Sequence, residues 1–228
     1  MAASLWLDAV QRLADRATHE IRNPLNGLAL NVEVVRSRAT RGGADVASIA
    51  RFADASAREL ERTIQLVDAL LSLARPVGAP LDLWDALRPL VTLHHALASA
   101  GEGRGTGKGR GRALDGDGER GEGNGAVVLA PRGGASLQVD ADPTVARVAL
   151  ATALDAAASA SSPPHVLCSV ERRDERHVVL VIRCAKPTSP APDAVLDLLR
   201  GSGIRLEAAS GGIIVLFRAL GRDPTTTT

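Results

Sequence analysis

Apolar residues recur at steps of three and four positions through the first forty residues of the chain. This spacing places apolar side chains along one side of an α-helix, and it predicts a helix over residues 4–39. The stripe contains Trp6, Val10, Leu13, Ala17, Ile21, Leu28, Val32 and Val35. Pro24 lies inside this run, where a proline removes a backbone donor and crowds the preceding turn. We therefore expect the helix to bend near Pro24.

A second amphipathic run covers residues 44–74, after the helix-ending glycines Gly42 and Gly43, and Pro76 ends it. Its apolar side contains Ile49, Phe52, Leu60, Ile64, Val67, Leu70 and Leu71. Two long helices joined by a short turn form a hairpin, and a hairpin alone leaves half of each apolar stripe in water. A second copy would complete a four-helix bundle, so the pattern predicts a homodimer.

The pattern then changes to a mixture of helices and strands, and the predicted fold class is α+β. Helices are expected over residues 81–98, 143–159 (with Asp142 as N-cap) and 190–199. Strands are expected over residues 127–129, 136–139, 165–171, 177–184, 204–208 and 213–220. We expect a hairpin domain over residues 1–76 and a second domain over 80–220. The glycine-rich residues 101–125 and the tail 221–228 are expected to be disordered.

One heptapeptide in the first predicted helix carries a specific motif, His19-Glu20-Ile21-Arg22-Asn23-Pro24-Leu25. His19 lies off the apolar stripe, so we expect its imidazole to face water. The segment resembles the phospho-accepting H-box of sensor histidine kinases, of the class whose dimerisation domain is a helical hairpin. The resemblance implies that His19 carries a phosphoryl group. The alternative is an ordinary exposed histidine on a coiled-coil helix.

The same resemblance implies roles for three neighbours of His19. Glu20 would orient His19 or accept its second ring proton. Asn23, one helical turn further along the same face, would donate a hydrogen bond to a phosphate oxygen or hold an attacking water. Arg22 would place positive charge near the phosphate, or serve only the surface.

The second predicted domain resembles the ATP-binding domain of histidine kinases, the Bergerat α/β sandwich, but it departs from that pattern at each nucleotide-binding element. Asp155 and Ala151 stand where the family has asparagines, one of which coordinates the magnesium of ATP. Arg183, Cys184, Ala185, Lys186 and Pro187 replace an aspartate and two spaced glycines. No room for the ATP lid remains before residue 193, and the glycines at 201 and 203 suit a turn. We therefore expect a degenerate domain that does not use ATP.

Composition excludes several classes of function. Lys plus Arg (27) nearly equal Asp plus Glu (26), so no strong field favours nucleic acid or an anionic membrane. No apolar run approaches the roughly 20 residues that span a bilayer, and the N-terminus does not resemble a signal peptide. Cys168 and Cys184 are expected to be buried thiols, which suits a cytoplasmic protein. His94 and His95 point about 100° apart on a helix, so they do not suggest a metal site.

Together these features predict a histidine phosphotransferase of a two-component phosphorelay. It would exchange phosphoryl groups between His19 and the aspartates of response-regulator receiver domains without ATP, or act as a response-regulator phosphatase. It would need no cofactor of its own, because the receiver domain would supply Mg²⁺. The alternative is a catalytically inert pseudokinase that docks response regulators, and an active ATP-dependent histidine kinase is less favoured.

Overall fold

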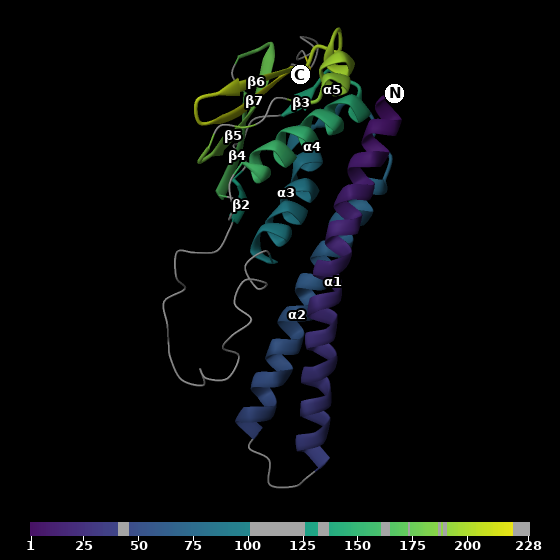
Figure 1. Cartoon of the computed structure of the whole chain (residues 1–228), viewed down its shortest axis with the longest axis vertical. Coiled ribbons are helices and arrows are strands. Elements are labelled where there is room, and N and C mark those ends of the chain that lie inside the picture. Colours follow the sequence, from purple (N-terminus) through teal and green to yellow (C-terminus); the bar gives the residue numbers. More distant parts are fainter. Residues whose placement is uncertain are drawn as a thin grey trace, which may run out of the picture.

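The computed structural model describes residues 1–40, 46–100, 126–131, 137–160, 165–172, 174–186, 188 and 191–220. Two long antiparallel helices form a hairpin, and an α/β sheet domain lies beside the end of the hairpin that holds the N-terminus (Figure 1). The predicted α+β class is confirmed. The expectations for residues 101–125 and 221–228 lie outside the described residues.

The hairpin consists of α1 (Ala2–Thr40) and α2 (Val46–Ala74). Leu13 and Ala17 are fully buried in the first half of α1, as the apolar spacing predicts, whereas Val32 remains 53% exposed. Pro24 is buried, and α1 stays helical through it. The half of the hairpin nearer to its turn extends beyond the sheet domain (Figure 1). Less of the apolar stripe in this half is therefore covered within one chain.

Three further helices belong to the sheet domain, namely α3 (Leu83–Ala100), α4 (Pro143–Ser159) and α5 (Asp193–Leu199). The sheet has five strands in the spatial order β2 (Ala126–Leu129), β4 (His165–Arg172), β5 (His177–Cys184), β7 (Gly212–Arg218) and β6 (Arg205–Ala209). Only β2 and β4 run parallel within this sheet. A separate antiparallel pair joins β1 (Leu81–Asp82) to β3 (Gln138–Val139).

Helix α4 is the central element of the sheet domain. Asp142 accepts hydrogen bonds from the backbone amides of Thr144 and Val145, and Pro143 occupies the first turn, so the predicted N-cap is confirmed. Residues 145–151 are all buried, which is the pattern of a helix covered on every side. Helix α4 contacts the strands of the sheet and also packs against α1 and α3.

Buried Arg147 connects α4 to the hairpin by hydrogen bonds. Its guanidinium donates to the carbonyl oxygens of Arg75 (2.9 Å), Ser72 (3.3 Å) and Leu73 (3.4 Å), at the C-terminal end of α2. The same guanidinium lies 5.2 Å from the centroid of the Trp6 ring on α1. A cation is favoured at a helix C-terminus, where backbone carbonyls lack partners. Burial lowers the pKa of Arg147 from its ordinary value.

Several predicted boundaries differ from the structure. Residues 81–82 form β1 instead of the first turn of a helix, since Leu81 pairs with Val139. The strand expected over 136–139 is reduced to Gln138–Val139 within the described residues. The helix expected over 190–199 begins at Asp193, because Pro192 has the extended ψ of an N-cap residue. Gly201 and Gly203 have φ values of 78° and 77°, which confirms the predicted turn.

Candidate functional site

His19 lies on the open side of α1, in the middle of the helix. Its neighbour Ala17 is buried against the core, whereas His19 itself is exposed. The predicted exposure of the imidazole is therefore confirmed. No hydrogen bond to the His19 side chain occurs among the described residues, so its ring nitrogens face water.

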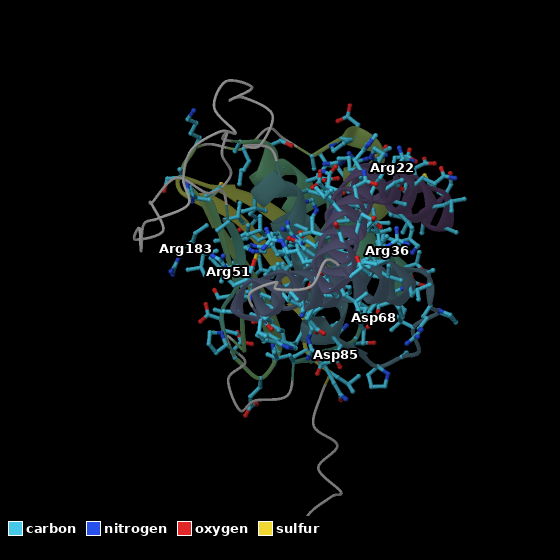
Figure 2. All side chains as sticks on the ribbon, turned by 90° about the horizontal axis from the view of Figure 1, so that it is seen from below. Arg22, Arg36, Arg51, Asp68, Asp85 and Arg183 are labelled. Carbon is cyan, nitrogen blue, oxygen red and sulfur yellow. The ribbon has the colours of Figure 1, made fainter. Side chains whose placement is uncertain are left out.

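The other three predicted site residues surround His19 on the helix surface. Arg22 and Asn23 are exposed and lie one turn beyond His19 on the same face, while Glu20 is half-buried on the adjacent face. Figure 2 shows Arg22 on the outside of the helical part of the molecule. No hydrogen bond or ion pair links these side chains to one another in the part of the chain that the structure describes. The arrangement is an open surface that a partner molecule can approach.

The structure adds two charged residues to this surface that the motif did not indicate. Arg16 lies one helical turn before His19, and its Nη2 is 3.2 Å from Oδ1 of Asp155 on α4. The side chain of Arg16 is 47% exposed and that of Asp155 is 24% exposed. In the sequence, Asp155 is notable only because it stands where the resembled family has the asparagine that coordinates magnesium. Its contact with the helix that carries His19 joins residues 139 positions apart, and no local pattern predicts it.

A buried histidine lies on the other side of Asp155. His94 of α3 is 2% exposed, and its Nε2 is 3.6 Å from Oδ1 of Asp155, which is beyond hydrogen-bond distance. Its Nε2 has no hydrogen-bond partner among the described residues. Burial lowers the pKa of His94 to about 4, although the nearby Asp155 carboxylate opposes the shift. His94 is therefore neutral near pH 7, and neighbouring His95 points to solvent, as their spacing predicts.

The end of β5 corresponds to the position at which the resemblance to ATP-binding domains implies an adenine-binding aspartate. Here Arg183 is exposed, and the thiol of Cys184 donates to the carbonyl oxygen of Lys186, 3.2 Å away. Burial raises the pKa of the Cys184 thiol. Cys168 on β4 is also buried, and burial raises its pKa to about 12. Both cysteines are buried thiols, as expected, and Pro187 lies outside the described residues.

Comparison with known proteins agrees with the position of His19. Residues 9–77 match the His Kinase A (phospho-acceptor) domain family, and this match covers the hairpin and the motif around His19. This segment is therefore similar to a histidine phospho-acceptor domain. Among solved structures, the histidine kinase AdeS of Acinetobacter baumannii is similar, with 14% identity over 90% of this chain and 98% of that chain, and a TM-score of 0.36. No curated protein matches the chain.

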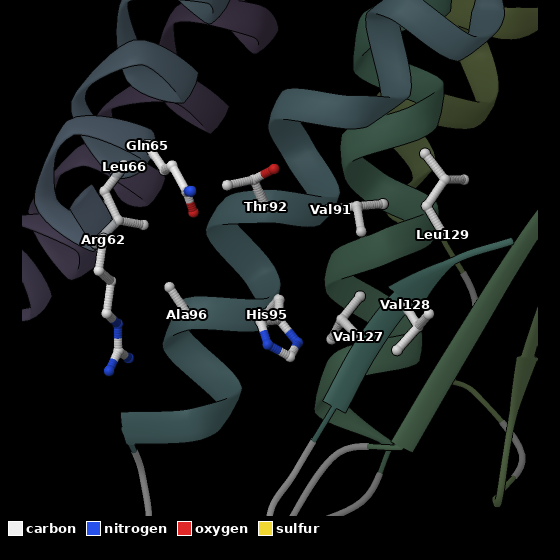
Figure 3. A pocket seen from close by; sticks show the side chains of 10 residues that line it. All are labelled: Arg62, Gln65, Leu66, Val91, Thr92, His95, Ala96, Val127, Val128 and Leu129. Carbon is white, nitrogen blue, oxygen red and sulfur yellow. The ribbon is translucent and has the colours of Figure 1, made fainter. Parts of the chain in front are cut away.

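A separate cleft is lined by elements other than α1, the helix that carries His19. It has a volume of about 660 Å³ and opens between α2, α3 and β2 (Figure 3). Arg62 and Gln65 line one wall, His95 and Thr92 line another, and the residues of β2 line the third. None of the predicted site residues lines this cleft.

Within the described ranges, no group of three or more His, Cys, Asp or Glu side chains is arranged to hold a metal ion. None of the helices in the described part of the chain is both long and apolar enough to cross a bilayer.

Proposed function

We propose that this protein is a histidine phosphotransferase that exchanges phosphoryl groups between His19 and the aspartates of response-regulator receiver domains. The observation that carries the proposal is the position of His19. It is exposed on α1, inside the segment that matches the phospho-acceptor family, and a receiver domain can approach it from solvent. The protein acts in two-component signalling and does not use ATP.

In the accepting step, the unprotonated nitrogen of neutral His19 attacks the phosphorus of the receiver's aspartyl phosphate. A nitrogen–phosphorus bond forms, and the bond from phosphorus to the carboxyl oxygen breaks, with the electron pair leaving on the carboxylate. The proton on the other ring nitrogen passes to Glu20 or to water. Transfer to a second receiver reverses these steps. Such in-line transfer depends mainly on positioning and on neutralising the phosphoryl charge.

The neighbours of His19 supply both the positioning and the charge neutralisation that the transfer requires. Asn23 lies one turn along the same face, where its side-chain amide donates to a phosphoryl oxygen. Arg22 is also one turn away and provides positive charge. The receiver domain brings the Mg²⁺ that offsets further charge on the phosphoryl group.

The proposal that ATP is not used rests on the geometry around α4 and β5. Asp155 stands where the resembled family has its magnesium-binding asparagine, but its carboxylate is already paired with Arg16 and would bring negative charge toward the phosphates of a nucleotide. Ala151, at the second asparagine position, is buried and has no polar group. Arg183 and Cys184 occupy the end of β5, and only residues 185–192 connect β5 to α5. The residues present do not fit a nucleotide.

We also propose that the hairpin dimerises. Leu60, Ile64, Val67 and Leu71 lie at steps of four, three and four along α2, and each is between 38% and 51% exposed in the single chain. Together they form an apolar stripe on one side of the helix. A second hairpin packed against this stripe would bury these side chains in a four-helix bundle.

One experiment tests the phosphotransferase directly. A panel of purified receiver domains is labelled with ³²P-acetyl phosphate and Mg²⁺, freed of donor, and mixed with the parent protein or with His19→Ala. Label should move to the parent protein as an acid-labile, base-stable phosphate, and none should move to the variant. Release of inorganic phosphate without a labelled intermediate would favour the phosphatase. Receiver binding without loss of label would favour the inert docking protein.

A further inference from the structure

Arg16 lies three residues before His19 on α1, and both side chains are exposed. Residues three apart on a helix are neighbours, with about 5–6 Å between their Cβ atoms. Side chains on a helix also lean toward its N-terminus, so the imidazole of His19 lies over the turn that contains Arg16. The charged or polar groups of α1 near His19 include Asp15, Arg16, Glu20, Arg22 and Asn23, and Asp155 of α4 and His94 of α3 lie beside Arg16.

Arg16 also has more N–H donors than its contact with Asp155 uses. A guanidinium carries five N–H donors, and in the described structure one nitrogen, Nη2, contacts Asp155. The pair holds the side chain along the surface between α1 and α4 and leaves its other donors at the solvent boundary. A phosphoryl group on His19 would present three oxygens and nearly two negative charges within reach of these donors.

Asp155 is fixed more firmly than a surface carboxylate. It extends from α4, whose residues 145–151 are buried and whose Arg147 is bound to the end of α2. Next to it, the buried ring of His94 restricts the space into which the carboxylate can turn. Asp155 is therefore suited to hold a mobile arginine in one position.

We propose that Arg16 binds the phosphoryl group carried by His19, and that Asp155 is the positioning residue that holds Arg16 beside it. This inference rests on the proposed function of His19. It gives the sheet domain a role in phosphotransfer that needs no nucleotide, because the domain supplies Asp155. An aspartate serves here where an asparagine would not, since only the charged group forms an ion pair with the guanidinium.

A simpler interpretation is that Arg16 and Asp155 form a surface ion pair without function, because exposed pairs contribute little to stability. The two interpretations differ in their consequences. A surface pair affects nothing at His19, whereas a phosphoryl-binding arginine changes the properties of the phosphorylated histidine itself.

The test uses the full-length variants Arg16→Gln, Asp155→Asn and the double variant. Arg36→Gln is the matched control, because Arg36 forms an exposed 2.9 Å ion pair with Glu33 on the same helix, remote from His19. Each protein is phosphorylated chemically with potassium phosphoramidate, which needs no partner, and the signal of His19 is assigned by its absence from His19→Ala, because His95 and His165 are also exposed. The pKa of the phosphoryl group is then followed by ³¹P NMR. In parallel, the equilibrium constant for transfer from a phosphorylated receiver is measured.

Arg16 favours the dianion, so Arg16→Gln should raise the phosphoryl pKa and lower the transfer equilibrium constant by about three- to tenfold, the scale of a partly exposed charge-assisted hydrogen bond. Asp155→Asn should give a smaller change in the same direction and no further change in the double variant. Arg36→Gln should match the parent. Circular dichroism confirms that each variant is folded.

The outcomes separate this inference from the proposed function. If the parent relays phosphate but Arg16→Gln leaves both quantities unchanged, Arg16 does not bind the phosphoryl group and the inference is wrong. Additive effects in the double variant would refute the positioning role of Asp155. If no receiver labels the parent, while the phosphoryl pKa of the chemically labelled protein still depends on Arg16, the proposed function fails and the arginine site remains.

Discussion

The guanidinium of Arg147, on α4, lies 2.9 Å from the carbonyl oxygen of Arg75, just beyond the end of α2. This contact joins the sheet domain to the hairpin through a charge that has no carboxylate partner among the described residues. It also places α4, and with it Asp155, at a fixed position beside α1. The local geometry around His19 therefore depends on a contact near the far end of the second helix.

Replacing Arg147 should destabilise the protein. Arg147→Ala removes three hydrogen bonds to carbonyl oxygens at the end of α2 and the contact with Trp6, and the bond to Leu73 that it removes is buried. We expect a loss of about 2–4 kcal/mol in the free energy of unfolding, measured by urea denaturation. Arg36→Ala, on the exposed surface of α1, should change it by about 0.5 kcal/mol or less. Equal stability of Arg147→Ala and the parent would contradict the structural role of this contact.

The sequence predicted elements whose signals are local. Asp142 followed by Pro143 marked the start of α4, and the alternation of β5 located that strand at both ends. The exposure of His19 followed from its place off the apolar stripe. By contrast, Arg16 and Arg147 make their contacts with residues distant in sequence. No periodic pattern encodes such pairs, because they arise only when the helices pack against one another.

Other differences have equally specific causes. Leu81 and Asp82 read as the first turn of α3, but β3 competes for their backbone and forms a ladder with them. Val32 follows the spacing of a buried stripe, yet it is 53% exposed within one chain. A helical pattern shows which side of a helix is apolar, and it does not show whether the covering partner belongs to the same chain.

The dimer is tested by placing a charge on the exposed stripe of α2. Ile64→Asp should weaken self-association by several kcal/mol, because a dimer would bury an unpaired carboxylate at that position. Sedimentation velocity at micromolar concentration should show a dimer for the parent and a monomer for the variant. Leu196→Asp, at a 37% exposed leucine on α5, is the control and should remain dimeric. A monomeric parent would rule the four-helix bundle out.

Asn23→Ala separates the two activities that His19 could support. If the protein dephosphorylates receivers, loss of the amide that holds the attacking water should slow phosphate release by roughly 10²-fold or more, while His19 is still labelled. If it relays phosphate, transfer in both directions should persist at a reduced rate. His165→Ala, at an exposed histidine on β4, should behave as the parent in both assays. An unaltered rate in both assays would exclude Asn23 from the site.

The protein should not bind nucleotide, and a single substitution at Asp155 should not create binding. Isothermal titration with MgATP should give no saturable heat for the parent, and ³²P from γ-labelled ATP should not be incorporated. Asp155→Asn introduces the asparagine that the resemblance to ATP-binding domains implies at this position, but Arg183 still occupies the end of β5. This variant should therefore remain unable to bind ATP. Micromolar affinity in either protein would overturn the proposal that the domain works without nucleotide.

Acid should destabilise the protein through His94. Burial lowers its pKa in the folded state to about 4, against an ordinary value of 6.5, so the unfolded state binds a proton first as the pH falls. Neutral His94 contributes fully to the free energy of unfolding above about pH 6.5, and this contribution is lost progressively between pH 6.5 and 4. The total loss in the free energy of unfolding amounts to roughly 3 kcal/mol.

Urea denaturation at intervals from pH 7.5 to 4 measures this loss, and comparison of variants assigns it. His94→Gln removes the titrating group, so its stability should fall less steeply over this range, although it is less stable than the parent at pH 7.5 because a buried side chain is changed. His165→Gln, at an exposed histidine, should retain the parent slope. If His94→Gln and the parent lose stability at the same rate between pH 6.5 and 4, another group controls the acid sensitivity.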